Sequence, residues 1–167
     1  MSKKTSKQKG NRYENKIARI LSKWIYGDPT ILGKTRGSGS IKYAWRGDIC
    51  PQKDLPELWK GYPFYIEAKH GYKHRVPTLY NFSIIQEWLT KAIHDQPENQ
   101  PILFLVCKFH RQRGHLLFSN TYLNFECNIA LNINSKLFYL YKLEELIIYN
   151  FFSIMDPEVI KPWISEV

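Results

Sequence analysis

The chain contains few cysteines and no long apolar segment. Its three cysteines, Cys50, Cys107 and Cys127, are odd in number, far apart and without zinc-ligand spacing. Cys107 lies in an apolar run, where we expect it to be buried. No apolar run approaches the length that crosses a bilayer, and the polar N-terminus lacks the apolar segment of a secretory signal. We therefore expect a cytoplasmic protein without a membrane partner.

Internal repeats and low-complexity segments are also absent. The 167 residues, of which 44% are hydrophobic, suit one modest core. The sequence therefore predicts a single domain over residues 10–167. Residues 1–9 contain four lysines and no acid, so we expect a flexible basic arm that could follow a phosphate backbone or remain a solvated tail.

Acidic residues are scarce where basic residues are frequent. Residues 1–120 contain 21 basic and 9 acidic residues, a net charge of +12, whereas residues 121–167 contain 3 and 6, a net charge of −3. A basic region of this size is typical of a nucleic-acid-binding surface, although basic surfaces also occur in proteins that bind none.

Three charged residues mark a candidate site within this basic region. Asp48 precedes a short apolar run, and Glu67 and Lys69 stand two residues apart in the next one. Alternate residues of a strand share a face, so we expect Glu67 and Lys69 to lie together. Two carboxylates suit a hard cation such as Mg²⁺, and the ammonium could orient a water or offset charge on a phosphate. The alternative for such a triplet is an exposed hairpin with one ordinary ion pair.

Two further segments favour the site. Residues 10–26 show the apolar spacing of an amphipathic helix, with Glu14 near its start. The alternative to a functional role is that this carboxylate only stabilises the helix N-terminus electrostatically. Residues 34–46 contain a Gly-Ser-Gly-Ser segment among four cations and no acid. Glycines let a backbone approach a phosphate closely, and cations neutralise it.

The order Gly10, Glu14, Arg36-Gly37-Ser38-Gly39, Gly47-Asp48-Ile49 and Ile66-Glu67-Ala68-Lys69 resembles the PD-(D/E)XK nuclease superfamily, and within it the archaeal-type and phage Holliday junction resolvases. The resemblance covers about residues 10–110 and implies an α/β, restriction-endonuclease-like core with a mixed central sheet flanked by helices. It implies a metal site of Glu14, Asp48 and Glu67, Lys69 as the catalytic lysine and Ser38 as a loop serine important for cleavage. The sequence departs from the pattern in its longer spacing between Asp48 and Glu67.

Further elements agree with this order. Apolar patterns predict helices at 82–94 and 143–152, a buried central strand at 102–109, and strands at 115–118 and 136–141. The DNA-binding candidates are the loop cations and glycine, the loop serine, and residues after the second apolar run: Lys34, Arg36, Gly37, Ser38, Lys42, Arg46, His70, Lys73 and Arg75. His110 and His115 have no recognisable partner and are given no role.

We therefore expect a Mg²⁺-dependent DNA endonuclease, with Mn²⁺ able to substitute and no small-molecule cofactor. We expect it to cut branched recombination intermediates in a prokaryotic or phage-infected host cell. A homodimer is expected from this substrate, because a two-fold dimer would be needed to cut both strands of a symmetric junction. Two alternatives stay open. One is a restriction-like or replication and repair nuclease acting on duplex or single strands, and the other is a nucleic-acid-binding protein of the same fold that does not cleave.

Overall fold

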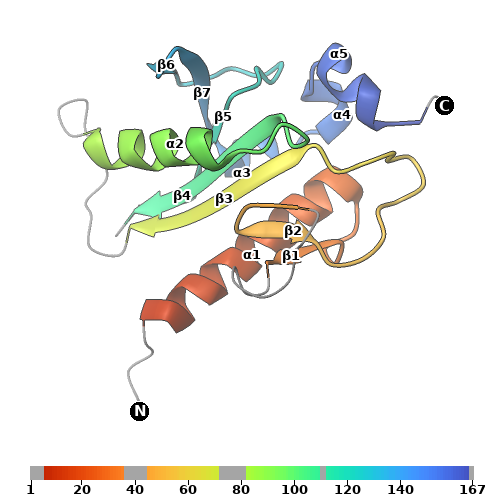
Figure 1. Ribbon diagram of the computed structural model, residues 1–167, viewed down its shortest axis with the longest axis horizontal. Helices are drawn as coiled ribbons and strands as arrows, with labels where there is room; N and C mark the ends of the chain where they lie inside the picture. The colour runs from red at the N-terminus through yellow and green to blue at the C-terminus, as the bar shows by residue number, and fades with distance from the viewer. Residues whose placement is uncertain (1–5, 36–44, 72–81, 110–111, 166–167) are drawn as a thin grey trace.

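A computed structural model describes residues 6–35, 45–71, 82–109 and 112–165. Its centre is a seven-stranded sheet with strand order β1-β2-β3-β4-β5-β7-β6. Strands β3 and β4 run parallel and the other neighbours are antiparallel. Helices α1 and α2 lie on opposite faces of this sheet (Figure 1). The expected α/β class and the mixed sheet flanked by helices are confirmed.

In the described residues, the elements follow one another along the chain as five helical and seven extended segments, with a short 3₁₀ turn at the end. They are α1 (Ser6–Tyr26), β1 (Leu32–Lys34), β2 (Ile49–Pro51), β3 (Phe64–Gly71), α2 (Ser83–Asp95), β4 (Ile102–Phe109), β5 (Leu116–Ser119), β6 (Ile129–Ile133), β7 (Lys136–Lys142), α3 (Leu143–Leu146), α4 (Phe151–Ile154), α5 (Pro157–Ile160) and η1 (Lys161–Trp163), in which α3, α4 and α5 are single turns. No described helix is both long and apolar enough to cross a membrane.

Strand β4 forms the middle of the core, and the strand predicted at 102–109 is confirmed. Phe104 and Val106 pack on the face that α1 covers, whereas Leu103 and Leu105 pack on the face that α2 covers. A continuous apolar run is therefore required, since both faces of this strand are buried. Each fully buried side chain of this size contributes about 1.5–3 kcal/mol to folding.

Helix α1 begins earlier than the apolar pattern indicated. We expected a start at residue 10, but the helix already includes Ser6, so part of the predicted arm is helical; residues 1–5 are not described. Glu14 consequently stands in the third turn, and the first turn contains no acid. The explanation of Glu14 as a charge that favours the helix terminus is therefore wrong.

The prediction of a single helix at 143–152 is also wrong. The segment forms two short helices, because α3 ends at Leu146 and Asn150 starts a new one. The Asn150 side chain accepts a hydrogen bond from the backbone N–H of Phe152 (2.9 Å), which is the usual role of asparagine at a helix N-cap. The apolar pattern thus indicated helical structure in this segment but not the break between Leu146 and the N-cap residue Asn150.

Candidate active site

Gly47 and Asp48 form the turn that enters β2. Gly47 has a φ of +102°, and a Cβ at this position would lie 2.7 Å from the carbonyl oxygen of Ile66. The backbone N–H of Asp48 donates to that same oxygen (2.8 Å). Thr35 donates its hydroxyl to the Gly47 carbonyl (2.8 Å) and its backbone N–H to the Asp48 carbonyl (2.9 Å). The backbone of Asp48 is thus fixed between β1 and β3.

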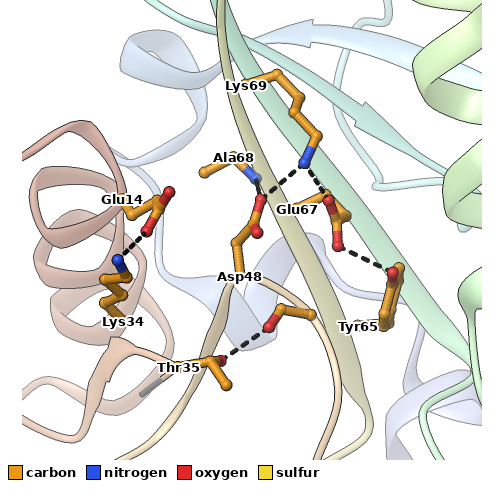
Figure 2. Close-up of polar contacts among 9 residues, drawn as sticks. Glu14, Lys34, Thr35, Asp48, Tyr65, Glu67, Ala68 and Lys69 are labelled. Atoms are coloured by element: carbon orange, nitrogen blue, oxygen red, sulfur yellow. Dashed lines mark hydrogen bonds and ion pairs between the residues drawn. The ribbon is translucent and has the colours of Figure 1, made fainter. Parts of the chain in front are cut away.

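The carboxylate of Asp48 lies beside the charged residues of β3. Its Oδ2 accepts the backbone N–H of Ala68 (3.0 Å) and lies 2.9 Å from Nζ of Lys69. Nζ of Lys69 also contacts Oε2 of Glu67, whose Oε1 accepts the hydroxyl of Tyr65 (2.9 Å). Figure 2 shows the ammonium between the two carboxylates. Glu67 and Lys69 therefore share a face of the strand, as its alternation predicted.

Burial and charge set the protonation of this cluster. The side chain of Glu67 is only 13% exposed, and both burial and the nearby carboxylate of Asp48 raise its pKa. The ammonium of Lys69 and the hydroxyl of Tyr65 oppose that rise. Burial alone would lower the pKa of Lys69, but the two carboxylates outweigh it and raise the pKa. Lys69 therefore remains a cation at neutral pH and stabilises the ionised form of Glu67.

The structure does not add Glu14 to this cluster. Its carboxylate lies 3.3 Å from Nζ of Lys34 (Figure 2). Nζ of Lys34 also donates a hydrogen bond to Asn11. Lys34 was expected to contact DNA, but its charge is paired with α1 here. The structure therefore brings Asp48, Glu67 and Lys69 together and leaves Glu14 paired with Lys34.

The remaining DNA-binding candidates divide into two groups. Arg46 is exposed, and its backbone is held by the buried side chain of Gln100, which accepts its N–H (2.8 Å) and donates to its carbonyl (3.1 Å). His70 points to the α1 face, where its ring packs edge-on against Tyr13 at a centroid distance of 5.1 Å. The others, Arg36, Gly37, Ser38, Lys42, Lys73 and Arg75, lie outside the described residues.

The donor set of the cluster fits a hard divalent cation. Among the residues that are described, no group of three or more histidine, cysteine, aspartate or glutamate side chains is placed to hold a metal ion. Mg²⁺ does not require such a cage, because it keeps several waters and binds through one or two carboxylates together with substrate phosphates. Asp48 and Glu67, which already converge on one positive charge, provide that pair.

One buried histidine was overlooked in the sequence. His115 precedes β5, its side chain is 4% exposed, and its Nδ1 contacts Oε1 of Glu144. Oε2 of Glu144 accepts the backbone N–H of His115 (2.9 Å). Glu144 stands 29 residues away in the chain, so no local pattern in the sequence indicated the pair. Gly114, in the turn before His115, has a φ of +76°, a backbone conformation that favours glycine.

This pair makes stability depend on pH. Burial, aided by the charges of Lys16 and Lys108, lowers the pKa of His115 below 6.5 although Glu144 opposes it. Partial burial would raise the pKa of Glu144, but hydrogen bonds from His115 lower it below 4.5. Both groups bind protons more weakly in the folded state, so each contribution to stability is present at higher pH and is lost as pH falls.

We therefore expect the melting temperature to fall from pH 7 to pH 4, first below 6.5 through His115 and then below 4.5 through Glu144. Thermal melts at several pH values check this, with the double variant His115→Gln/Glu144→Gln for comparison. The variant should show a smaller decline over the same range. Parallel declines in the two proteins would contradict the assignment.

The fold and the cluster together define a class of protein. A mixed sheet in which an aspartate precedes one strand and a Glu-x-Lys triplet stands on the next is the restriction-endonuclease-like arrangement of PD-(D/E)XK nucleases. Residues 5–153 match the family described as "Phage putative PDDEXK endonuclease", and the chain belongs to this family. The searches of curated proteins and of solved structures found no match. The expected superfamily is thus confirmed, and the chain is a nuclease by family.

Proposed function

We propose that this nuclease is a metal-dependent DNA endonuclease whose phosphodiester hydrolysis takes place at Asp48, Glu67 and Lys69. The observation that carries the proposal is the ammonium of Lys69, which is shared by the two partly buried carboxylates of Asp48 and Glu67 beside β3. Such a group of charges, two negative and one positive, is costly to bury without a function for it. It also combines the acidic and cationic groups that hydrolysis of a phosphodiester requires.

Each residue of the cluster has a distinct part in the proposal. Asp48 and Glu67 bind Mg²⁺ or Mn²⁺, and the hydrogen bonds from Ala68 and Tyr65 orient their carboxylates. The bound metal supplies Lewis acidity to the phosphate and to water. Lys69 orients the attacking water or offsets the negative charge that develops on the phosphate. Glu14 supports the site indirectly by holding Lys34.

For the substrate, we propose branched DNA, with the protein acting as a Holliday junction resolvase. Support comes from the order of motifs, including the segment around Ser38, and from the net charge of +12 over residues 1–120. Cutting both strands of a symmetric junction requires two active sites, so we propose a homodimer. Such a protein would act in the cytoplasm of a prokaryotic or phage-infected cell.

Two other functions fit part of these observations. A restriction-like or repair nuclease would use the same cluster on duplex or single-stranded DNA. A non-cleaving binding protein would keep the fold and the basic surface, but the retained acids and lysine have no purpose in such a protein. Relative cleavage rates on different DNA structures distinguish a restriction-like or repair nuclease from a resolvase. The absence of metal-dependent cleavage would favour the non-cleaving binding protein.

Ser38 separates a resolvase from a general nuclease. We expect Ser38→Ala to slow cleavage of a four-way junction by about tenfold or more, because the hydroxyl would bond a phosphate oxygen at the strand exchange point. The measurement is single-turnover cleavage of a four-way junction and of linear duplex with matched arms. Ser40→Ala, in the same segment, is the control and should cut both like the wild type. Equal cleavage of duplex and junction by the wild type would contradict the resolvase assignment.

A further inference from the structure

A basic pocket of about 390 Å³ lies on the face of the sheet opposite to Glu67 and Lys69. It is formed by one side of α1 and by residues of β3, β4 and the segment before β5. His70 follows Lys69 in β3, so its side chain points to this other face. The lining residues, which include four cations and no acid, are Lys9, Arg12, Tyr13, Lys16, His70, Lys108 and His115.

The ring of His115 has a nitrogen that the protein does not satisfy. Its Nδ1 is turned to Glu144, and its Nε2 has no hydrogen-bond partner among the described residues. The ring stacks on Tyr13 at a centroid distance of 5.9 Å, which fixes its plane within the pocket wall. A buried polar nitrogen without a partner lowers the stability of the fold. A ligand that bonds this nitrogen would remove this loss of stability.

Three cations of the pocket, Arg12, Lys16 and Lys108, have no acidic partner in the described residues. Like charges around one concave site repel each other, and an anion of charge −1 or −2 relieves that repulsion. Glu144 faces the far side of the His115 ring and is paired with it, so it does not neutralise these cations.

The row of charges on α1 favours a polymer over a single ion. Exposed cations recur every three or four residues along one face of the helix, from the pocket to its last turns: Lys9, Arg12, Lys16, Arg19 and Lys23. Over these residues the helix rises about 21 Å. One strand of nucleic acid presents several phosphates over that length. An isolated phosphate ion would use only the pocket.

We propose that this pocket binds a backbone phosphate of the nucleic acid, as a phosphate subsite separate from Asp48, Glu67 and Lys69. Arg12, Lys16 and Lys108 neutralise the phosphate, and Nε2 of His115, once protonated, donates to one of its oxygens. The subsite fixes the nucleic acid across the end of the sheet, on the face away from the hydrolytic residues. The inference rests on the proposed function only in taking nucleic acid as the ligand.

The test is equilibrium binding of a labelled oligonucleotide, as duplex and as single strand, measured by anisotropy in EDTA. We expect Arg12→Ala/Lys16→Ala to weaken binding by about tenfold or more and to reduce the slope of log K against log salt by about 2. The control is Lys136→Ala/Lys161→Ala, which removes the same charge from exposed lysines outside α1 and the pocket. Its affinity should change by less than about twofold. Equal affinities of the two double variants would overturn the proposal.

His115 provides an independent readout. The ionisable groups around its ring are Lys16 and Tyr13 of α1, His70 of β3, Lys108 of β4 and Glu144 of α3. A phosphate favours the protonated ring, so wild-type affinity should increase between pH 7.5 and pH 5.5 by more than the affinity of His115→Gln. Thermal melts check that His115→Gln is folded. If it is not folded, Lys108→Ala is used in its place, and its affinity for the oligonucleotide should be lower than that of the wild type. Identical pH dependence in the folded variant and the wild type would contradict the role of the ring.

A titration with inorganic phosphate distinguishes the two sources of the ligand group. If the nucleic acid is the ligand, millimolar phosphate should compete weakly with the oligonucleotide, and the competition should be lost in Arg12→Ala/Lys16→Ala. If phosphate shifts the NMR signals of His115 while that variant binds oligonucleotide normally, the pocket is an anion site unrelated to nucleic acid. Because binding is measured in EDTA, a failure to cleave DNA would contradict the proposed function alone, and normal binding by the variant would contradict the subsite alone.

Discussion

Replacing Lys69 with alanine is expected to lower the rate of DNA cleavage by on the order of 1,000-fold while DNA affinity changes by less than about threefold. The ammonium lies between Asp48 and Glu67, where the reacting phosphate would meet the carboxylates. Its loss removes stabilisation of the transition state and few contacts with the bound phosphate backbone. Single-turnover cleavage and equilibrium binding, measured on the same DNA, separate the two effects.

Asp48→Asn and Glu67→Gln should reduce cleavage to a similar extent, since each keeps the shape of the side chain and removes its charge. Lys60→Ala is a suitable control, because Lys60 is exposed and lies outside the cluster. Thermal melts must show that each variant is folded, as loss of the ammonium leaves two carboxylates facing each other. Cleavage by folded Lys69→Ala or Asp48→Asn at a near-normal rate would contradict the assignment.

Gly47→Ala is expected to lower the free energy of unfolding by about 2–4 kcal/mol and to abolish cleavage. The added Cβ would lie 2.7 Å from the carbonyl oxygen of Ile66, at a φ of +102°. That oxygen accepts the N–H of Asp48, so relief of the clash must displace the active-site aspartate. For a chain of this length, the melting temperature should fall by roughly 5–15 °C.

Gly27 provides the matched control for this effect. It also has a positive φ, +76°, but a Cβ there would have nothing within 4 Å. Gly27→Ala should therefore show only the cost of the left-handed backbone, about 1–2 kcal/mol, and should cleave DNA normally. Differential scanning calorimetry of both variants compares their losses of stability and so separates the effect of the clash from that of the backbone strain. A Gly47→Ala variant no less stable than Gly27→Ala would contradict the close packing of this turn.

Local sequence patterns were sufficient for the centre of the sheet and for the cluster on β3. A strand buried on both faces must be apolar throughout, which made 102–109 recognisable, and strand alternation placed Glu67 beside Lys69. The approach of Asp48 to Lys69 spans 21 residues and depended on the resemblance to known nucleases.

Other features depended on contacts that no local pattern contains. Strand β6 was missed because most of its residues are exposed and show no buried alternating face, and only pairing with β7 makes them a strand. The turn between the two strands places Asn134 and Ser135 at positive φ, which is uncommon for residues other than glycine. His115 was given no role because Glu144 reaches it only through the fold. The pairing of Glu14 with Lys34 likewise joins α1 to β1 across 20 residues.

The most direct test of the central claim is cleavage of four-way junction, duplex, flap and single-stranded DNA by the purified protein, with Mg²⁺ or with EDTA, beside Glu67→Gln. The account predicts that the wild type cleaves at least one of these DNAs with Mg²⁺, and that EDTA or Glu67→Gln abolishes the cleavage. Cleavage that persists in EDTA or in folded Glu67→Gln, or no cleavage of any of the four by the wild type, would contradict it.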